Sequence, residues 1–302
     1  MTGASGFIGQ CLVRRLLRSS LWEVCGTARR SEEYADPDLI RLEINGDTDW
    51  TLALEGVHTV VHLAGLAHTG RFSRADMSAE HTKVNVDGTA ELARQAARAG
   101  IQRLVFLSSI KVLGEDGEFD EESAPNPQDP YSVSKWRAEG ALHAISHATG
   151  LRYTTIRSPL VYGPSAKANF RMLADALKLG IPLPLGSIRN RRSFVAIDNL
   201  VDFIETCMRN PAAENETFVV SDMEDLSTPD LCIRLANAMG RRAHLFAVPA
   251  VVLRSMGGLC GVPGLVERLL GSLCVNPSKA TRVLGWTPIV DVDEGLRRAV
   301  RG

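Results

Sequence analysis

A tyrosine and a lysine four residues apart are the side chains of this sequence best suited to proton transfer. In Tyr131-Ser132-Val133-Ser134-Lys135 a helix would place the phenol and the ammonium on one face, one turn apart. A fixed ammonium stabilises a phenolate, so we expect Lys135 to lower the pKa of Tyr131 from about 10 toward neutrality. Tyr131 would then act as a general acid and base. By itself this spacing is also typical of a surface tyrosine beside a solvated lysine, so the surrounding motifs decide its meaning.

Two serines follow a strand at a place where a substrate oxygen could meet this tyrosine. Ser108 and Ser109 come directly after the apolar run from Leu104 to Leu107, which predicts a buried strand. In open α/β sheets, ligands bind at the carboxyl ends of the strands. A serine hydroxyl at that edge can donate a hydrogen bond to the oxygen that Tyr131 protonates.

The chain opens on a glycine-rich turn that could bind a dinucleotide. Gly3, Gly6 and Gly9 recur every third residue, and a helix is predicted from Phe7 to about Ser19. Such glycines let backbone N–H groups at a helix N-terminus approach a pyrophosphate. A structural turn is the alternative, and the alternation of strands and helices downstream favours the cofactor. The expected cofactor contacts here come from Gly3, Ser5, Gly6, Phe7, Ile8 and Gly9.

A Rossmann fold needs a central strand before this turn, and only Met1 and Thr2 precede it. A missing central strand would leave the backbone groups of both neighbouring strands unpaired. Our hypothesis is that the native chain begins about six or seven residues earlier, judged from the usual length of a strand.

The end of the second strand bears on the choice between the two dinucleotides. An acidic residue there binds the adenosine ribose hydroxyls, whereas arginine accommodates a 2′-phosphate. This sequence has Arg29 and Arg30 at that place and no acid. NADP(H) is therefore favoured over NAD(H), the alternative being that both arginines are simply solvated.

Short apolar strands and amphipathic helices alternate through the first half of the chain, which is typical of a parallel sheet. After Gly163-Pro164 the elements become shorter. The predicted fold is α/β, with a Rossmann-type doubly wound parallel sheet in residues 1–163 and a smaller C-terminal substrate-binding region in 164–302. Residues 217–220 look like a strand and are expected to return to the main sheet. The other predicted strands are 22–28, 40–44, 59–64, 104–107 and 153–157, and the main helices are 79–99 and 132–148.

Composition and charge disfavour several other classes of protein. With 302 residues, 45% of them hydrophobic, and a net charge of -1 without arginine runs, the chain is expected to be globular and to bind no nucleic acid. Prolines and charges interrupt the apolar stretch 245–275, so no membrane span and no membrane partner are expected. The 6 cysteines form no CxxC pair and no secretory signal is expected, so we expect a cytoplasmic protein. No metal is expected, because His58, His62 and His68 lack an accompanying carboxylate or cysteine cluster.

Together these motifs make the sequence resemble the NAD-dependent epimerase/dehydratase family, the extended short-chain dehydrogenase/reductases, over essentially its whole length. The resemblance implies that Ser109 holds the 4-oxygen of a sugar, that Tyr131 is the acid and base, and that Lys135 binds the nicotinamide ribose. It also implies that Leu63, Ala64, Gly65, Asn85, Pro159 and Val161 line the cofactor with Tyr131 and Lys135. The matching segments are 2–9, 62–65, 85–89, 107–109, 131–135, 157–164, 277–280 and 284–286.

The resemblance further implies a nucleotide-sugar substrate whose diphosphate contacts Asn169 and Arg192. A planar guanidinium suits a diphosphate. Asn169 could instead cap the helix that starts at Phe170, and Arg192 could be a solvated surface charge. Lys111 and Arg268 complete the expected substrate contacts.

The residues after Ser109 narrow the reaction at C4 of the sugar. Dehydratases of this family carry an Asp-Glu pair there, whereas this sequence has Ile110 and Lys111, so dehydration is not expected. The run 108–112, with 182–187 and 190–193, resembles bacterial UDP-N-acetylquinovosamine dehydrogenases of O-antigen synthesis. We therefore favour reduction of a UDP-4-keto-6-deoxy-N-acetylhexosamine to UDP-N-acetylquinovosamine or its epimer.

Two other functions stay open at this point. A UDP-hexose or UDP-N-acetylhexosamine 4-epimerase would oxidise and re-reduce the same carbon. A non-catalytic NADP(H)-sensing protein is disfavoured because Ser109, Tyr131 and Lys135 are all retained. Since relatives often pair through a four-helix bundle, a homodimer through helices 79–99 and 132–148 is also expected.

Overall fold

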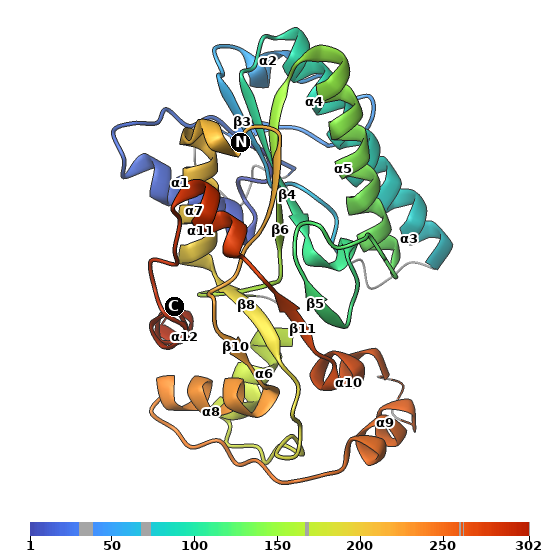
Figure 1. The fold of residues 1–302 in the computed structure, drawn as a ribbon, viewed down its shortest axis with the longest axis vertical. Coiled ribbons are helices and arrows are strands. Elements are labelled where there is room, and N and C mark those ends of the chain that lie inside the picture. The colour runs from blue at the N-terminus through green and yellow to red at the C-terminus, as the bar shows by residue number, and fades with distance from the viewer. Residues whose placement is uncertain (30–38, 68–73, 167–168, 260, 262, 302) are drawn as a thin grey trace.

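The computed structural model describes residues 1–29, 39–67, 74–166, 169–259, 261 and 263–301. In Figure 1 the upper part of the molecule is layered, with helices on the faces of a sheet, and a smaller lower part is built mostly from the second half of the chain.

The main sheet is parallel in all of its described pairings. Four strands lie side by side in the order β3, β4, β6 and β9, and β1 pairs with β2. In β4 and β6 the register brings Ser109 opposite Ser158, so both strands end at the same edge of the sheet. The strands are β1 (Gly26–Ala28), β2 (Leu39–Arg41), β3 (Thr59–His62), β4 (Arg103–Ser109), β6 (Arg152–Ser158) and β9 (Glu216–Val219).

Thr2 joins these two sets of strands. It forms parallel bridges to Thr27 in β1 and to His62 in β3, and its N–H donates to the carbonyl of Val61 over 2.9 Å. The order β2-β1-Thr2-β3-β4-β6-β9 confirms the expected α/β Rossmann-type fold. The hypothesis of an earlier native start stays a prediction.

Helices cover both faces of the main sheet because its strands are apolar on both sides. Successive β4 residues alternate between two cores: Val105 and Leu107 pack in the core shared with α1 and α7, and Leu104 and Phe106 in the core shared with α4 and α5. Figure 1 shows these helix pairs flanking the strands. The helices are α1 (Phe7–Leu17), α7 (Ile197–Arg209), α4 (Gly88–Arg98) and α5 (Pro130–Thr149), together with the shorter α2 (Thr51–Leu54) and α11 (Ser278–Leu284).

The helix predicted over 79–99 is divided into three segments. α3 (Arg74–His81) leads into a π-helical segment, η1 (Thr82–Asp87), and α4 follows. A π-helical turn widens the helix and re-aims its side chains, and such turns are frequent at functional sites. Asn85 lies inside η1 and is 1% exposed, so the irregularity points this amide into the protein.

The smaller lower part has a sheet of its own. β8 pairs with β7, β10 and β11, and β11 also pairs with β5. The strands are β5 (Gly117–Phe119), β7 (Leu160–Tyr162), β8 (Arg192–Ala196), β10 (Asp225–Leu226) and β11 (Leu273–Val275), and two single 3-10 turns, η2 (Ile110–Val112) and η3 (Pro211–Ala213), occur elsewhere. The surrounding helices are α6 (Asn169–Lys178), α8 (Thr228–Ala238), α9 (Ala250–Leu259), α10 (Pro263–Leu270) and α12 (Val292–Arg301).

The two parts are interleaved along the chain. β9 follows β7, α6 and β8 in sequence, yet it pairs in parallel with β6 at the edge of the main sheet. No described helix is both long and apolar enough to cross a bilayer.

Candidate active site

Helix α5 presents Tyr131 in its first turn and Lys135 one turn later. Its start is strongly specified, because Asp129 caps it in a reciprocal box with Ser132 and Pro130 takes the first position. The Asp129 carboxylate accepts from the Ser132 N–H over 2.6 Å, and the Ser132 hydroxyl lies 3.0 Å from the Asp129 N–H. The local sequence therefore fixes where the tyrosine stands at the carboxyl edge of β4.

Tyr131 is joined to Ser109 by a side-chain hydrogen bond, as its expected role requires. Burial nevertheless raises the pKa of the Tyr131 phenol to about 12, although the hydrogen bond with Ser109 opposes the increase. The expected lowering of this pKa is therefore wrong for the structure as it stands. The reason is that withdrawal from water penalises the phenolate, and the negative charge of Asp129 adds to the penalty.

Lys135 is buried, with 4% of its surface exposed, and its ammonium is directed to the strand beneath it. Its Nζ donates to the carbonyl of Leu107 over 2.9 Å and lies 4.6 Å from the centre of the Phe106 ring. Burial lowers the pKa of Lys135 to about 8, with Glu139 acting in the opposite direction. The lysine is thus placed beside the end of β4, where it loses its proton more readily than a solvated lysine.

Lys111 lies on the wall of the same site, and two carboxylates hold its ammonium. Its Nζ lies 2.7 Å from Glu115 and 2.8 Å from Asp129. Burial acts to raise the pKa of Asp129, but hydrogen bonds from Lys111 and Ser132 outweigh it and hold that pKa at about 2. Lys111 therefore ties the segment after β4 to the cap of α5.

The glycine turn is built for close backbone approach. Gly3 has a φ of +69°, and a Cβ on it would lie 2.8 Å from the backbone nitrogen of Ala64. A Cβ on Gly9 would lie 2.1 Å from the carbonyl oxygen of Gly3. No side chain caps α1, whose N-cap is Gly6, so its first N–H groups remain available to an anion. The backbone of the glycine turn thus packs directly against the backbone of the loop after β3.

Asn85 fastens that loop to α5 with three hydrogen bonds. Its Oδ1 accepts from the Leu66 N–H over 2.8 Å, and its Nδ2 donates to the Leu66 carbonyl over 3.0 Å and to the Ser134 hydroxyl over 2.9 Å. The sequence predicts that Asn85 contacts the cofactor. In the structure, the oxygen and nitrogen of its side-chain amide are hydrogen-bonded to Leu66 and Ser134. Ser134 was not singled out from the sequence, although its position next to Lys135 was a usable signal.

Two cavities meet at Ser109 and Tyr131. The smaller, about 250 Å³, lies between α1, the loop after β3 and α5. The larger, about 720 Å³, extends from the same two side chains into the lower part of the molecule. The smaller cavity is lined by Ile8, Leu63, Gly65, Ala67, Leu107, Ser108, Ser109, Tyr131, Lys135, Ser158, Pro159 and Val161.

Ser108 and Ser158 are further polar residues at this junction. Ser158 lines both cavities, and its position opposite Ser109 follows from the register of two predicted strands, which extend two residues and one residue beyond their predicted ends at 107 and 157. The Ser108 hydroxyl is buried and has no hydrogen-bond partner among the described residues. An unpaired buried hydroxyl is costly, so its place in the smaller cavity fits a polar ligand there.

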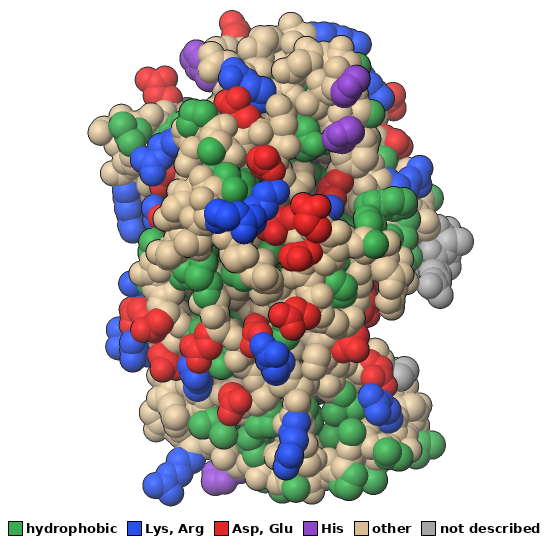
Figure 2. All heavy atoms as spheres, in the orientation of Figure 1, with side chains coloured by type: hydrophobic (Ala, Val, Ile, Leu, Met, Phe, Trp, Pro, Cys, Tyr) green, Lys and Arg blue, Asp and Glu red, His purple; other side chains and the backbone are tan. Residues whose placement is uncertain are grey.

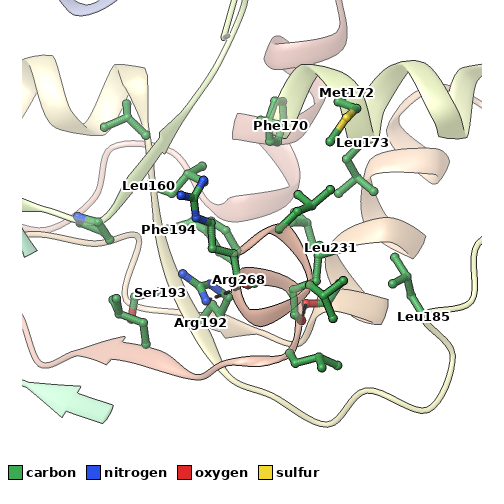
Figure 3. Close-up of a pocket in the computed structure, with 18 of the residues that line it drawn as sticks. Leu160, Phe170, Met172, Leu173, Leu185, Arg192, Ser193, Phe194, Leu231 and Arg268 are labelled. Atoms are coloured by element: carbon green, nitrogen blue, oxygen red, sulfur yellow. Dashed lines mark hydrogen bonds between the residues drawn. The ribbon is translucent and has the colours of Figure 1, made fainter. Parts of the chain in front are cut away.

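The larger cavity is lined mostly by apolar side chains, and away from the hydroxyls of Ser109 and Tyr131 two arginines, Arg192 and Arg268, form a cationic corner. Arg192 donates from Nη1 to the carbonyls of Arg268 and Gly271 over 2.9 and 3.0 Å, and both arginines line the cavity. Figure 3 shows Arg192 and Arg268 close together, with Met172, Leu173 and Leu185 on the other side of the cavity. Burial lowers the pKa of Arg192, because the guanidinium is withdrawn from water.

Two expected contacts lie outside the described part of the structure, and other residues singled out from the sequence line neither of the two cavities. Arg30 is outside the described residues, and Arg29 is exposed directly after β1. Asn169 begins α6, but its side chain is outside the described part of the structure. His62, one of the histidines weighed as metal ligands, is hydrogen-bonded to Thr2 and Thr89 over 2.7 and 2.9 Å.

Known proteins resemble most or all of this chain. A UDP-glucose 4-epimerase from Vibrio cholerae is 38% identical over 307 residues, 100% of this chain and 94% of the relative. An N-acetyl-α-D-glucosaminyl-diphospho-ditrans,octacis-undecaprenol 4-epimerase from Escherichia coli is 26% identical over 265 residues, covering 86% and 77% of the two chains. The structure of MoeE5 in complex with UDP-glucose and NAD has a TM-score of 0.78 at 25% identity, covering 99% of this chain and 96% of that one.

These similarities agree with the enzyme class expected from the sequence, and two of the named relatives are 4-epimerases. The family model described as "NAD dependent epimerase/dehydratase family" matches residues 1–221 of this chain. The chain is therefore an enzyme of the nucleotide-sugar epimerase/dehydratase type and belongs to the NAD-dependent epimerase/dehydratase family, the extended short-chain dehydrogenase/reductases.

Proposed function

We propose that this enzyme is a 4-epimerase of a UDP-linked hexose or N-acetylhexosamine. The observation that carries the proposal is the meeting of two cavities at Ser109 and Tyr131. A sugar in the larger cavity would present C4 to the two hydroxyls and, behind them, to the smaller cavity. The whole-length similarity to a UDP-glucose 4-epimerase supports epimerisation as the overall reaction.

The smaller cavity would hold the nicotinamide end of NAD. The glycine turn offers uncapped N–H groups to the pyrophosphate, and the buried Ser108 hydroxyl offers a partner for a polar group of the cofactor. In this proposal Ser5, Phe7, Ile8, Leu63, Gly65, Pro159 and Val161 contact the cofactor, and Asn85 acts by holding the 63–66 loop. Bound NAD would supply the acceptor and donor of a hydride at C4.

Tyr131 and Ser109 would handle the proton on the 4-oxygen. When C4 is oxidised, Tyr131 accepts the hydroxyl proton, and it returns that proton when the ketone is reduced. Ser109 donates a hydrogen bond to the same oxygen and stabilises the charge that develops on it. Because burial holds the Tyr131 phenol protonated, the oxidation step needs a compensating positive charge, which we assign to Lys135.

The cationic corner of the larger cavity would bind the substrate diphosphate. Arg192 is held by two backbone carbonyls, so its planar group is fixed in place for a bidentate contact. Arg268 adds a second guanidinium, and Asn169 stays a proposed contact. Lys111 faces the cavity, but its pairing with Glu115 and Asp129 assigns it to positioning α5.

The second candidate is the 4-keto reductase favoured by the sequence. The specific observation on its side is Arg29, which is exposed directly after β1 and would suit the 2′-phosphate of NADPH. A reductase consumes a reduced cofactor in every turnover, whereas an epimerase regenerates its cofactor. The preference for NADP(H) and the homodimer through α4 and α5 stay predictions.

One pair of assays separates the two candidates. Purified enzyme is incubated with UDP-glucose or UDP-N-acetylglucosamine and NAD⁺, and the C4 epimers are resolved by chromatography. In parallel, anaerobic enzyme receives NADPH and a UDP-4-keto-6-deoxy-N-acetylhexosamine, and the near-ultraviolet absorbance of NADPH is followed. We expect interconversion of epimers without net change in cofactor, and stoichiometric loss of NADPH with no epimer formation would instead establish the reductase.

A further inference from the structure

An ion pair between Glu139 on α5 and Arg157 on β6 is buried in the protein. Figure 2 shows Lys and Arg side chains interspersed with Asp and Glu over the surface, where water solvates them. By contrast, only 11% of each side chain of this pair is exposed. The Arg157 Nη2 donates to the Glu139 Oε2 over 2.8 Å, and the Arg157 Nε lies 3.3 Å from both carboxylate oxygens. The guanidinium thus holds the carboxylate through two of its nitrogens.

Stability alone does not account for this pair. Withdrawing two charges from water is costly, and well-packed apolar side chains of similar volume often stabilise a protein at least as well. The guanidinium is also incompletely satisfied, because the Arg157 Nη1 is buried and has no hydrogen-bond partner among the described residues. The position of the pair relative to the active site indicates a second role.

Glu139 lies one helical turn after Lys135. The two residues are four apart on α5, so their side chains share one face of the helix. The Glu139 carboxylate attracts the ammonium and opposes the effect of burial on the pKa of Lys135. Because Arg157 holds this carboxylate, the Lys135 Nζ donates to the Leu107 carbonyl instead. Glu139 therefore acts on the ammonium through space, without a direct ion pair between these two described residues.

The nearest other ionisable side chains are neutral. Tyr131 lies one turn before Lys135, and burial raises the pKa of its phenol to about 12. On β3, burial lowers the pKa of His62 to about 3, and the charge of Lys135 adds to the decrease. Neither group carries a negative charge near pH 7, so neither can favour the ammonium.

The elements around this part of α5 supply no competing carboxylate for Lys135. In η2, Lys111 binds the Asp129 carboxylate at the start of α5 over 2.8 Å. In α3, His81 packs edge-on against the ring of Tyr131, with the ring centres 6.1 Å apart. The charged residues of η1, Lys83 and Asp87, are exposed. Within the described part of the chain, Glu139 is therefore the counter-charge of Lys135.

We propose that Glu139 and Arg157 are positioning residues that keep the ammonium of Lys135 charged and thereby set the alkaline limit of catalysis. This inference rests on the proposed function, in which Lys135 compensates the charge of the Tyr131 phenolate. Arg157 fixes the carboxylate so that it attracts the ammonium but leaves it directed at Leu107. Both members of the pair lie outside the two cavities, so they act on the reaction only through Lys135.

Lys135 titrates close enough to neutrality for this carboxylate to matter. Its pKa is about 8, so near that pH a weaker attraction converts a large part of the lysine to the neutral amine. The neutral amine cannot stabilise the Tyr131 phenolate, and oxidation at C4 would slow. Without Glu139 this loss would begin at a lower pH.

The pH dependence of kcat tests the proposal. Glu139→Gln removes the negative charge at nearly constant size, and its alkaline limit should fall by about half a pH unit or more. Glu139→Asp keeps the charge and should restore most of the limit. Glu205→Gln is the matched control: Glu205 is also buried and bound by an arginine, Arg15, but it lies outside both cavities and should leave the limit unchanged.

A second variant guards against loss of the fold. Because Glu139→Gln leaves the buried Arg157 charge unpaired, the double variant E139Q/R157Q removes both charges together. Its alkaline limit should fall as in the single variant. A purely structural role of the pair would instead lower kcat equally at every pH and leave the limit where it is in the wild type.

Protein stability reports the charge of Lys135 independently of the reaction. Above pH 8 the unfolded chain binds more protons than the folded one, so the free energy of unfolding relative to Lys135→Met rises with pH. In the Glu139→Gln background this rise should begin at a lower pH. That shift in an enzyme without epimerase activity would count against the proposed function alone. An onset or an alkaline limit that Glu139→Gln leaves unchanged, or an equal shift in Glu205→Gln, would overturn the proposal.

Discussion

The side-chain amide of Asn85 donates a 2.9 Å hydrogen bond to the hydroxyl of Ser134, the residue directly before Lys135. Through this contact the π-helical segment η1 holds both the loop after β3 and the helix that carries Tyr131. The loop proposed to contact the cofactor and the helix proposed to carry the catalytic tyrosine are therefore held by the same buried amide.

Replacing Asn85 by alanine should lower the free energy of unfolding by about 1–3 kcal/mol, because Leu66 and Ser134 would each lose a buried partner. Ser134→Ala should cost less, about 1 kcal/mol, since it removes one of the three bonds of Asn85 together with the bond from the Ser134 hydroxyl to the Tyr131 carbonyl. Urea denaturation of both single variants and the double variant measures the coupling, which should be about 1 kcal/mol. Strictly additive losses would show that the contact carries no energy of its own.

Tyr131→Phe should reduce kcat by about 10²- to 10⁴-fold with little change in cofactor affinity, because only the transferable proton is lost. Steady-state assays and a cofactor titration check this. Tyr153→Phe is the matched control, since Tyr153 is buried in the core between β6 and α5 and lines neither cavity. Near-normal turnover in the Tyr131 variant would remove the phenol from the mechanism.

Lys135 should make stability depend on pH in the alkaline range. Its pKa is about 8 in the folded protein and 10.5 by reference, so between these values the unfolded chain binds more protons than the folded one. The free energy of unfolding of the wild type, relative to Lys135→Met, should therefore rise as the pH is raised from 8 to 10. Chemical denaturation at both pH values measures it, and a constant or falling difference would contradict the burial of the ammonium.

Arg192→Lys should raise KM for the UDP-sugar by about tenfold or more while changing kcat little, because lysine cannot reproduce a fixed bidentate contact. Its neighbour provides the control: Arg191 pairs with Asp225 and lies outside both cavities, so Arg191→Lys should leave KM unchanged. Equal effects of the two substitutions would argue against a diphosphate site at Arg192.

Gly3→Ala should destabilise the protein and weaken dinucleotide binding, because the new Cβ would be strained at φ +69° and would lie 2.8 Å from the backbone of Ala64. Gly56 has the same φ of +69° with no atom within 4 Å of its Cβ position, so Gly56→Ala isolates the strain, about 1 kcal/mol. Calorimetry with and without NAD compares the two. Equal losses in both variants would show that the turn and the loop are not packed as described.

The sequence predicts those parts of the structure that local rules determine. The β4 run is apolar at successive residues, and a strand buried on both faces requires that pattern. Asp129-Pro130 is a helix-start signal, and α5 begins at Pro130, two residues before the predicted start at 132, so Tyr131 and Lys135 both lie on it. The predicted strands 104–107 and 153–157 already place Ser108 and Ser109 at the carboxyl edge of the sheet, although β4 and β6 end slightly later, at Ser109 and Ser158.

Other features depend on contacts between distant segments and were not predictable from local pattern. The π-helical turn at Thr82–Asp87 has an ordinary amphipathic sequence, and its departure from the α-helix goes with bonds from Asn85 to Leu66 and Ser134. The pairing of Lys111 with Asp129 joins residues 18 apart. The pKa of Tyr131 depends on burial by the whole site, which spacing alone does not reveal.

The position of β9 has a consequence for how the two parts of the molecule can move. β9, the edge strand of the main sheet, follows β7, α6 and β8 in the sequence. The backbone therefore passes between the main sheet and the lower part more than once. Several backbone connections between the lower part and the main sheet allow small rotations of one against the other but prevent their separation. Nicking the chain between α6 and β8, in residues 179–191, should therefore leave two fragments that co-purify, because β9 of the second fragment pairs with β6 of the first.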